Sequence, residues 1–340
     1  MSISDNSQSQ YNNQPKKEIL DALQQALMKA VIAGGTTAMQ FYQQPMSWPD
    51  EEQQTVSKNP STLADLQATL SILHVLNDYI SPICTDLDCD FFCLGEETHF
   101  QKWFQKQLPA LLFQKILSSS DFVNQQKGVR IIIDGIDGTG NFIRGIPLFC
   151  SAAAIFIADQ LRISAIYNPI RHVVYTAMIP DHSQPKNNSN TEAWEWDISN
   201  NHRIDLINKV KNDPPKKLSH EAIGIHLTRN NPEKIHEFLS ENPVHKKSIL
   251  EQLSNVSGGI YAFNSSMIAM VDVARGALGA YINNITHLWD IAAGEVLIRA
   301  CGGKVTDFLQ NPISYTSPKH VSVIVAKNHL YDDLISVLKV

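Results

Sequence analysis

The spacing of apolar residues predicts alternating helices and strands along most of the chain. Between Lys17 and Tyr42 they recur every three or four positions, as on one face of a helix, and a second such stretch begins near Ser61. In contrast, Ile131–Ile133 is a row of β-branched residues typical of a buried strand. The alternation continues toward the C-terminus, which predicts a mixed α/β fold without internal repeats.

The remaining elements follow from the same patterns. Strands are expected at DFFCLGEE, Ala152–Ala158, Ile163–Tyr167, EAIGIHL, ALGAYI and HVSVIVA, and helices at HFQKWFQKQLPALLFQKIL (broken at Pro109), SSMIAMVDVARG and DIAAGEVLIRACGG. Residues 1–15 are rich in Ser, Asn and Gln, and we expect a disordered tail there. The polar stretch Asp181–Thr191 predicts a boundary between an N-terminal half, 16–190, and a C-terminal half, 191–340.

Composition and charge narrow the kinds of molecule that the protein is expected to bind. The 340 residues carry a net charge of -6 and no strong basic run, which argues against nucleic acid or an anionic membrane surface. Leu148–Ala158, an apolar run, is too short to span a bilayer, and no signal peptide is visible. The 5 cysteines follow no metal-ligand spacing, so we expect reduced thiols in a cytoplasmic protein.

The stretch IIIDGIDGTGNF, Ile131–Phe142, carries the strongest chemical signal. A buried strand leads into Asp134 and Asp137, which repel each other unless a hard cation neutralises them. Thr139 and Gly140 then enter a predicted helix, whose N-terminal N–H groups favour an anion such as phosphate. From this stretch alone the alternative stays open that it is an acidic turn with Asp137 as an N-cap.

Three familiar phosphate-binding or phosphatase motifs do not fit this stretch. A P-loop needs a Lys-Ser/Thr pair after its glycines, and the dinucleotide fingerprint needs G-x-G-x-x-G, whereas GIDGTG has the reverse spacing. A haloacid-dehalogenase-type phosphatase needs D-x-D, but the spacing here is D-x-x-D.

Other acids stand at the ends of predicted elements. Glu96 follows a strand, Asp290 precedes a helix behind Trp289, and Asp65 lies in the first turn of the second helix. Each also has a structural interpretation, because Asp290 can be an N-cap and Asp65 a capping-box acid. For Asp65 the residues alone favour the capping role.

Taken together, STLADLQA, GEE, DGIDGTGNF, AIYNPI and WDIAAGEVLIRACGG resemble, in order, the motifs of the inositol monophosphatase family of lithium-sensitive, magnesium-dependent phosphomonoesterases. The resemblance extends from about Lys17 to the C-terminus. It implies a layered α-β-α-β-α sandwich with a metal-binding N-terminal half and a C-terminal half that completes the active site. It also implies hydrolysis of a small phosphomonoester by metal-activated water.

The resemblance assigns metal ligands by position. Glu96, Asp134 and the main-chain carbonyl of Ile136 would hold one Mg²⁺. Asp134, Asp137 and Asp290 would hold a second. The family's use of two to three Mg²⁺ per site implies a weaker third ion near Glu96.

The same motifs imply the catalytic and phosphate-binding groups. Asp65 would help Glu96 at the third ion and pair with Thr139, which would orient the attacking water. Backbone N–H groups of Gly138, Thr139 and Gly140 would bind phosphate.

Departures from the family pattern bear on the substrate. The family's small-residue turn corresponds to Asn264, Ser265 and Ser266, which would line the substrate pocket. Many inositol phosphatases carry a substrate-binding glutamate seven residues before the closing aspartate, where this chain has Asn283, so inositol phosphate is in doubt. Gly135 replaces the usual proline and is expected to loosen the turn.

The resemblance therefore implies a Mg²⁺-dependent phosphomonoesterase that acts on a small phosphorylated substrate as a homodimer. The alternative substrates are a 3'(2'),5'-bisphosphate nucleotide, a sugar phosphate or histidinol phosphate. From a different class, the chain can be a weakly catalytic relative used for binding or regulation.

Overall fold

The structure is a computed structural model of the whole chain. It describes residues 16–44, 63–96, 100–125, 128–179, 191–226, 249–316 and 320–338. The tail predicted for residues 1–15, the helix start expected near Ser61 and most of the loop Asp181–Thr191 lie outside these ranges.

The larger sheet has seven strands in chain order. They are β1 (Phe91–Gly95), β2 (Val129–Asp137), β3 (Cys150–Ile157), β4 (Gln160–Asn168), β5 (Val173–Met178), β6 (Glu192–Asp197) and β7 (His202–Asp205). Strands β1 and β2 are parallel, and every later pair is antiparallel. The long apolar run of β2 is buried along its whole length, as a strand covered on both faces requires.

The smaller sheet has five strands in the order β11-β12-β10-β8-β9. Their bounds are β8 (Ala222–His226), β9 (Gly259–Tyr261), β10 (Ala280–Thr286), β11 (Lys304–Thr306) and β12 (Val321–Ala326). Strands β8, β9 and β10 are parallel to one another, whereas β12 is antiparallel to both of its neighbours.

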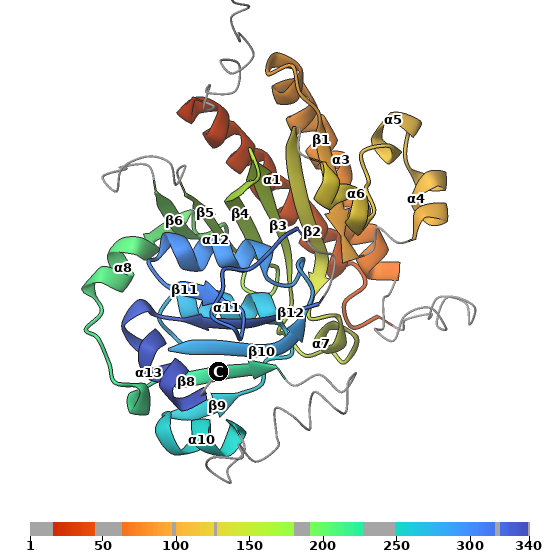
Figure 1. Cartoon of the computed structure of the whole chain (residues 1–340). Coiled ribbons are helices and arrows are strands. Elements are labelled where there is room, and N and C mark those ends of the chain that lie inside the picture. The colour runs from red at the N-terminus through yellow and green to blue at the C-terminus, as the bar shows by residue number, and fades with distance from the viewer. Residues whose placement is uncertain are drawn as a thin grey trace, which may run out of the picture.

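Helices cover and separate the two sheets. One outer layer is α1 (Lys17–Met39) with α3 (Leu63–Asp86), the middle layer is α11 (Ser266–Ala274) with α12 (Ala292–Ala300), and the other outer layer is α10 (Ile249–Val256) with α13 (Asn328–Leu338). Three apolar clusters fill the spaces between these layers. Figure 1 shows the resulting order, helix–sheet–helix–sheet–helix. The predicted α-β-α-β-α sandwich is confirmed.

Short helices connect these layers. They are α4 (Gln101–Gln107), α5 (Ala110–Phe113), α6 (Ser119–Asn124), α7 (Thr139–Ile143), α8 (Leu206–Asn212) and the 3₁₀ turn η2 (Leu218–His220). The helix expected before β2 is broken at Pro109 as predicted, and its end pairs with the edge of β1 through a bridge between Cys93 and Ile116. This segment covers an edge that would otherwise be open.

Helix α1 packs closely on the rest of the N-terminal layer because it carries two adjacent glycines. A Cβ at Gly34 would lie 2.7 Å from Cγ1 of Ile72 on α3, and one at Gly35 would lie 2.6 Å from Cδ1 of Tyr167 on β4. The helix runs through both glycines without interruption. Their role is close approach, which fixes α3 and its Asp65 against the sheet.

The sequence patterns missed the hairpin of β6 and β7. Half-buried Trp194 and Trp196 alternate with buried Ala193 and Glu195, which is a strand pattern. The seven-stranded sheet therefore continues to Asp205. The proposed division of the chain near residue 190 stays a prediction.

Among the described residues, no helix is both long enough and apolar enough to cross a membrane.

Candidate metal centre and active site

A β-bulge places Asp134 and Asp137 on the same side of β2. Residues three apart in a regular strand point to opposite faces. Here Asp134 pairs with Ala152 but Asp137 pairs with Cys150, so three steps on β2 oppose two on β3. The extra residue turns the strand between the two carboxylates. The aspartates thus lie within the last part of the strand, where we had expected them beyond its end.

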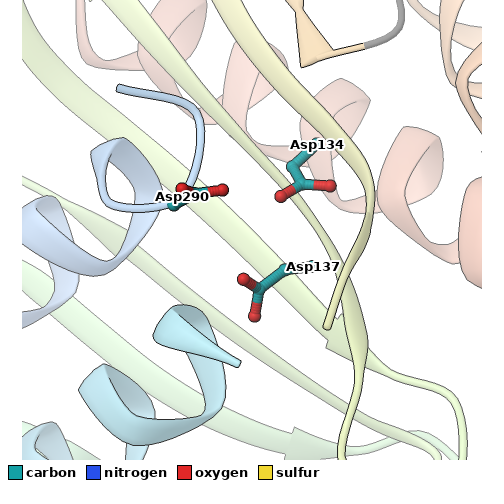
Figure 2. A group of neighbouring side chains, drawn as sticks. All are labelled: Asp134, Asp137 and Asp290. Carbon is teal, nitrogen blue, oxygen red and sulfur yellow. The ribbon is translucent and has the colours of Figure 1, made fainter. Parts of the chain in front are cut away.

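Asp290 brings the third carboxylate from the loop between β10 and α12. One carboxylate oxygen from each of Asp134, Asp137 and Asp290 lies within 4.8 Å of the other two. Figure 2 shows the three side chains turned toward a common space. Asp290 does not cap α12, because its Oδ2 accepts hydrogen bonds from Thr286 Oγ1 at 2.8 Å and from the His287 N–H at 2.9 Å.

Asp137 is fixed by the N-terminus of α11. Its carboxylate accepts backbone N–H bonds from Ser266 at 3.2 Å and Met267 at 3.0 Å, and a short bond from the hydroxyl of Ser265. Burial and the negative charge of Asp290 raise the pKa of Asp137 to about 7, although these hydrogen bonds oppose the rise. The alternative role of Asp137 as an N-cap of α7 is wrong, since α7 is capped by Gly138 without a side-chain bond.

Asp134 lies at the centre of the cluster without a hydrogen-bond donor. It is 1% exposed, and neither of its carboxylate oxygens has a hydrogen-bond partner among the described residues. Burial, followed by the negative charges of Glu96, Asp137, Asp290 and Asp65, raises its pKa well above the ordinary value. A buried carboxylate with only acids around it is unstable as an anion unless a cation joins it.

Asp65 and Thr139 meet beside this cluster. Asp65 is 1% exposed in the first turn of α3, and Thr139 Oγ1 lies 2.9 Å from its Oδ1. The same hydroxyl lies 2.9 Å from the carbonyl oxygen of Ile136. Asp65 therefore has a partner 74 positions away. The capping-box interpretation does not account for its burial or this contact, whereas the pairing implied by the resemblance does.

Glu96 and the glycine turn lie at the edges of the same cluster. Glu96 directly follows β1, and its negative charge acts on Asp134. Gly138 has a φ of 89°, which favours glycine, and it leads into Thr139 and Gly140 at the start of α7. Binding of metal by Glu96 and of phosphate by this turn stays a prediction.

Gly135 is needed for close packing at the bulge, and the expectation of a looser turn stays a prediction. A Cβ at this position would lie 2.5 Å from Oγ1 of Thr69 and 2.9 Å from the carbonyl oxygen of Asp65. Helix α3 therefore approaches the bulge closely, which brings Asp65 to Thr139.

The residues expected to bind substrate have contacts of their own within the protein. Asn264 has a φ of 57°, and its Nδ2 would lie 3.3 Å from a Cβ at Gly140. Ser265 is the N-cap of α11. Asn283 is 2% exposed, and its amide donates to Tyr281 Oη at 3.2 Å and accepts from the Ile285 N–H at 3.1 Å. Contact of these residues with substrate stays a prediction.

Three residues near the site were not singled out from the sequence. Asn141, the Asn of the DGTGNF motif, donates to the carbonyl oxygens of Leu148 and Phe263, both at 2.7 Å. Burial lowers the pKa of His226, and the negative charge of Asp290 opposes that lowering. The buried Nδ1 of His226 has no hydrogen-bond partner among the described residues. Tyr281 is 1% exposed and bonds Ser266. Only Asn141 had a sequence signal, because it stands inside the motif.

The donor set fits a hard divalent cation. Its members are carboxylate oxygens from β2 and from the loop before α12, and carboxylate and carbonyl oxygens are the ligands that Mg²⁺ prefers. The two unpartnered oxygens of Asp134 are the feature that a cation would satisfy.

These observations define a class: a five-layer α/β sandwich with a largely buried acidic site where the large sheet meets the middle helices. Residues 19–339 match the model of the inositol monophosphatase family. The chain belongs to the inositol monophosphatase family. Membership of a family of phosphatases supports a phosphatase-like function.

Two curated relatives illustrate the range of names in this family. The chain is 30% identical over 184 residues to an inositol-1-monophosphatase of Mesorhizobium japonicum, an alignment covering 52% of this chain and 56% of the relative. It is 25% identical over 228 residues to the Nus factor SuhB of Escherichia coli, covering 65% of this chain and 74% of the relative. The chain thus aligns with little more than half the length of the first of these two proteins.

Solved structures agree on the fold. A suhB protein of Bartonella henselae superposes with a TM-score of 0.63 at 20% identity, covering 95% of this chain and 98% of that one. The Thermotoga maritima IMPase gives a TM-score of 0.63 at 17% identity, covering 95% and 97%.

Proposed function

We propose that the protein is a Mg²⁺-dependent phosphatase that hydrolyses a small phosphomonoester by direct attack of water. The observation that supports this most is Asp134, a buried carboxylate with no donor and four acids around it. A site built only to hold the fold would have a cation or a donor from the protein at this position.

In this proposal the acids divide into overlapping sets of ligands. Glu96, Asp134 and the carbonyl of Ile136 hold one Mg²⁺, and Asp134, Asp137 and Asp290 hold a second. Glu96 with Asp65 holds a weaker third ion. When bound, the ions supply charge stabilisation to the phosphoryl oxygens and activate water.

Thr139 has the geometry to orient a water molecule. A hydroxyl has one proton, so a hydrogen bond donated to the Asp65 carboxylate at 2.9 Å leaves the lone pairs of Oγ1 able to accept from a water. The negative charge of Asp65 favours this direction over donation to the carbonyl of Ile136. Asp65 therefore determines which way Thr139 presents its hydroxyl.

The phosphate is proposed to lie on the turn Gly138–Gly140, whose N–H groups begin α7. Asn264 borders this turn, because its Nδ2 would lie 3.3 Å from a Cβ at Gly140. We propose that Asn264 borders the alcohol part of the substrate, with Ser265 and Ser266 behind it on α11. The contacts of Asn283 favour a supporting role for that residue.

Other properties go with this proposal through the family resemblance. They are inhibition by Li⁺ in place of the second Mg²⁺, a homodimer and a cytoplasmic location. The alternative substrates are bisphosphate nucleotides, sugar phosphates and histidinol phosphate.

A phosphate-release screen tests the proposal. Purified protein is given inositol, sugar, histidinol and nucleotide phosphates with Mg²⁺ or with EDTA, beside the Asp134→Asn variant. We expect release from at least one substrate, only with Mg²⁺, and little from the variant. No release from any substrate would favour the binding or regulatory alternative, whose family relatives include proteins named Nus factor SuhB.

A further inference from the structure

A chain of buried hydrogen bonds joins the two sides of the acidic cluster. Its centre is Tyr281 on β10, whose hydroxyl lies 2.9 Å from Oγ of Ser266 and accepts from Nδ2 of Asn283 at 3.2 Å. All three side chains are buried, with exposed fractions of 1% for Tyr281, 3% for Ser266 and 2% for Asn283. Water therefore cannot replace these partners.

Each end of this chain leads to a carboxylate of the cluster. On one side, the N–H of Ser266 donates to Oδ1 of Asp137 at 3.2 Å. On the other side, Oδ1 of Asn283 accepts from the N–H of Ile285 at 3.1 Å. The next two residues after Ile285 supply the donors that hold Asp290.

The backbone near Asp290 depends on Asn283 because the sheet is irregular there. The pairing of β10 with β12 shifts register between Asn283 and Thr286. Ile285 lies within this irregularity, and its N–H is bonded by the Asn283 side chain. The amide thus fixes the segment that positions the donors to Asp290.

We infer that Tyr281 is a positioning residue that sets the spacing between Asp137 and Asp290 and so the affinity of the site for Mg²⁺. The inference rests on the proposed metal-dependent function. Tyr281 acts through Ser266 on one side and through Asn283 on the other, and it is not itself a metal ligand.

The direction of the bond from Asn283 is set by its donor. The Asn283 Nδ2 can only donate, so the Tyr281 oxygen accepts from it, and the phenolic proton stays available for the bond with Ser266 Oγ, in which either hydroxyl can donate. Burial raises the pKa of Tyr281 well above its ordinary value, so the hydroxyl keeps this proton at neutral pH. A phenylalanine would fill the same volume but leave Asn283 and Ser266 without their shared partner.

The first test is Mg²⁺ binding by the full chain with Tyr281→Phe, measured by calorimetry after removal of metal, with Mn²⁺ binding by electron paramagnetic resonance as a second probe. Loss of groups that orient metal ligands weakens affinity by about 10- to 100-fold in other sites. We expect about 10-fold weaker binding, because the ligands themselves remain.

A matched control separates this effect from general loss of stability. Tyr331 on α13 is 5% exposed, and its hydroxyl lies 2.7 Å from Thr306 Oγ1 in the outer layer. Tyr331→Phe removes the same kind of bond away from the acidic cluster. We expect both variants to melt at lower temperature than the wild type, and only Tyr281→Phe to bind Mg²⁺ less tightly.

Combining substitutions at Tyr281 and Ser266 tests whether Tyr281 acts on the metal site through the Ser266 hydroxyl. Ser266→Ala removes the hydroxyl that bonds to Tyr281 but keeps the N–H that holds Asp137. It should weaken Mg²⁺ binding several-fold by itself, and Tyr281→Phe should then add less than twofold, because groups in one network are not additive. If Tyr281→Phe does not fold, the loss of affinity in Ser266→Ala carries the test.

Two outcomes would overturn the inference while leaving the proposed function in place. One is wild-type Mg²⁺ affinity in both Tyr281→Phe and Ser266→Ala in a protein that binds Mg²⁺ and releases phosphate. The other is full additivity of the two losses. A wild-type chain that binds no Mg²⁺ would overturn both proposals, and one that binds Mg²⁺ without phosphatase activity would overturn the function alone.

Discussion

The two ends of helix α11 carry buried charges that are balanced in opposite ways. At its C-terminal end, the Glu195 carboxylate on β6 lies 3.3 Å from the Arg275 guanidinium and 3.7 Å from the Arg171 guanidinium. The Arg275 guanidinium also lies 3.6 Å from the Asp272 carboxylate. At its N-terminal end, three aspartates face one another, and the charged groups of the described residues that act on Asp134 are other acids.

The difference shows which cluster is complete within the protein. Two acids and two arginines cancel at the C-terminal end, so that network can hold β6, the β4–β5 turn and α11 together without help. At the N-terminal end, burial and the negative charges of neighbouring acids together raise the pKa of Asp134. At the C-terminal end burial also raises the pKa of Asp272, but there the charges of Arg275 and Arg171 oppose the rise. Of the two clusters, the acidic one at the N-terminal end of α11 is the one whose charges the protein does not balance. We therefore assign the proposed metal-binding function to it.

The largest expected effect is on catalysis. Asp134→Asn removes the central charge of the incomplete cluster and should lower kcat at saturating Mg²⁺ by about 100-fold or more, the scale of losing one preorganised electrostatic group. The fold should remain, because the change relieves repulsion and leaves the core filled. Steady-state kinetics with circular dichroism checks this. Near-full Mg²⁺-dependent activity in the variant would remove Asp134 from the metal site.

A substitution in the balanced cluster around Glu195 should have the opposite result, a loss of stability with little change in activity. Arg275→Met leaves the Glu195 side chain, only 8% exposed, with Arg171 as its remaining cation. We expect the free energy of unfolding to fall by about 2 kcal/mol, below the range for fully buried pairs because Arg275 is partly exposed. Activity per folded molecule should stay within about twofold.

Urea unfolding measures this loss, with Asp332→Asn as a control at an exposed pair. Asp332 lies 3.5 Å from Lys304, and its side chain is 89% exposed. That variant should change the unfolding free energy by less than about 0.5 kcal/mol. Equal effects of the two substitutions would contradict a structural role for the Glu195–Arg275 pair.

The third prediction concerns pH in the absence of metal. An acid whose pKa is higher in the folded than in the unfolded chain makes folding less favourable as pH rises toward the folded pKa. The pKa of Asp137 is raised to about 7 and that of Asp134 is also raised well above its ordinary value. The unfolding free energy in EDTA should therefore fall by about 1–2 kcal/mol between about pH 5.5 and 7, below the folded pKa of Asp137.

Mg²⁺ and a substitution supply the controls for this pH dependence. Saturating Mg²⁺ should abolish the decline, because a bound cation favours the ionised carboxylates. Asp134→Asn should reduce it in EDTA, since one of the titrating groups is gone. A metal-free wild type whose stability rises over the same range would contradict the raised pKa values.

These contacts explain what the sequence could and could not predict. The apolar run before Asp134 and the acids after it were readable locally, and so were the layers, because helix and strand periods are local properties. The bulge was not readable, because it depends on pairing with Ala152 and Cys150. The burial of Asp65 was also hidden, since it requires Thr139 and the close approach at Gly135.

Residues on α11 and β10 also make contacts that could not be predicted from the sequence. Ser265 and Ser266 read from the motif as substrate contacts, whereas the structure shows their N–H and hydroxyl groups bonded to Asp137 and Tyr281. Nothing in the sequence links Tyr281 to Ser266, because they lie 15 positions apart and meet only when β10 packs on α11.

The smallest expected effect is on the choice of substrate at Asn283. The sequence pattern alone suggests that Asn283→Glu would restore the family's glutamate and improve hydrolysis of inositol 1-phosphate. The structure shows an amide that is 2% exposed and already bonded to Tyr281 and Ile285. We therefore expect the ratio of kcat/KM for inositol 1-phosphate to that for other phosphoesters to change less than about threefold, an energy below about 0.7 kcal/mol.

Steady-state kinetics of Asn283→Glu and Asn283→Gln on inositol 1-phosphate and the other phosphoesters decide whether Asn283 contacts substrate or only supports the metal centre. Glutamine has nearly the shape of glutamate but no charge, so a charge-assisted bond to a substrate hydroxyl would separate the two variants. A rise of about five- to thirty-fold for inositol 1-phosphate in the glutamate variant alone would show that position 283 meets the substrate. If both variants have similar kcat/KM ratios and each binds Mg²⁺ more weakly, Asn283 is a residue that supports the metal centre. That outcome would also mean that the acidic cluster selects for the phosphate and that other residues select the alcohol.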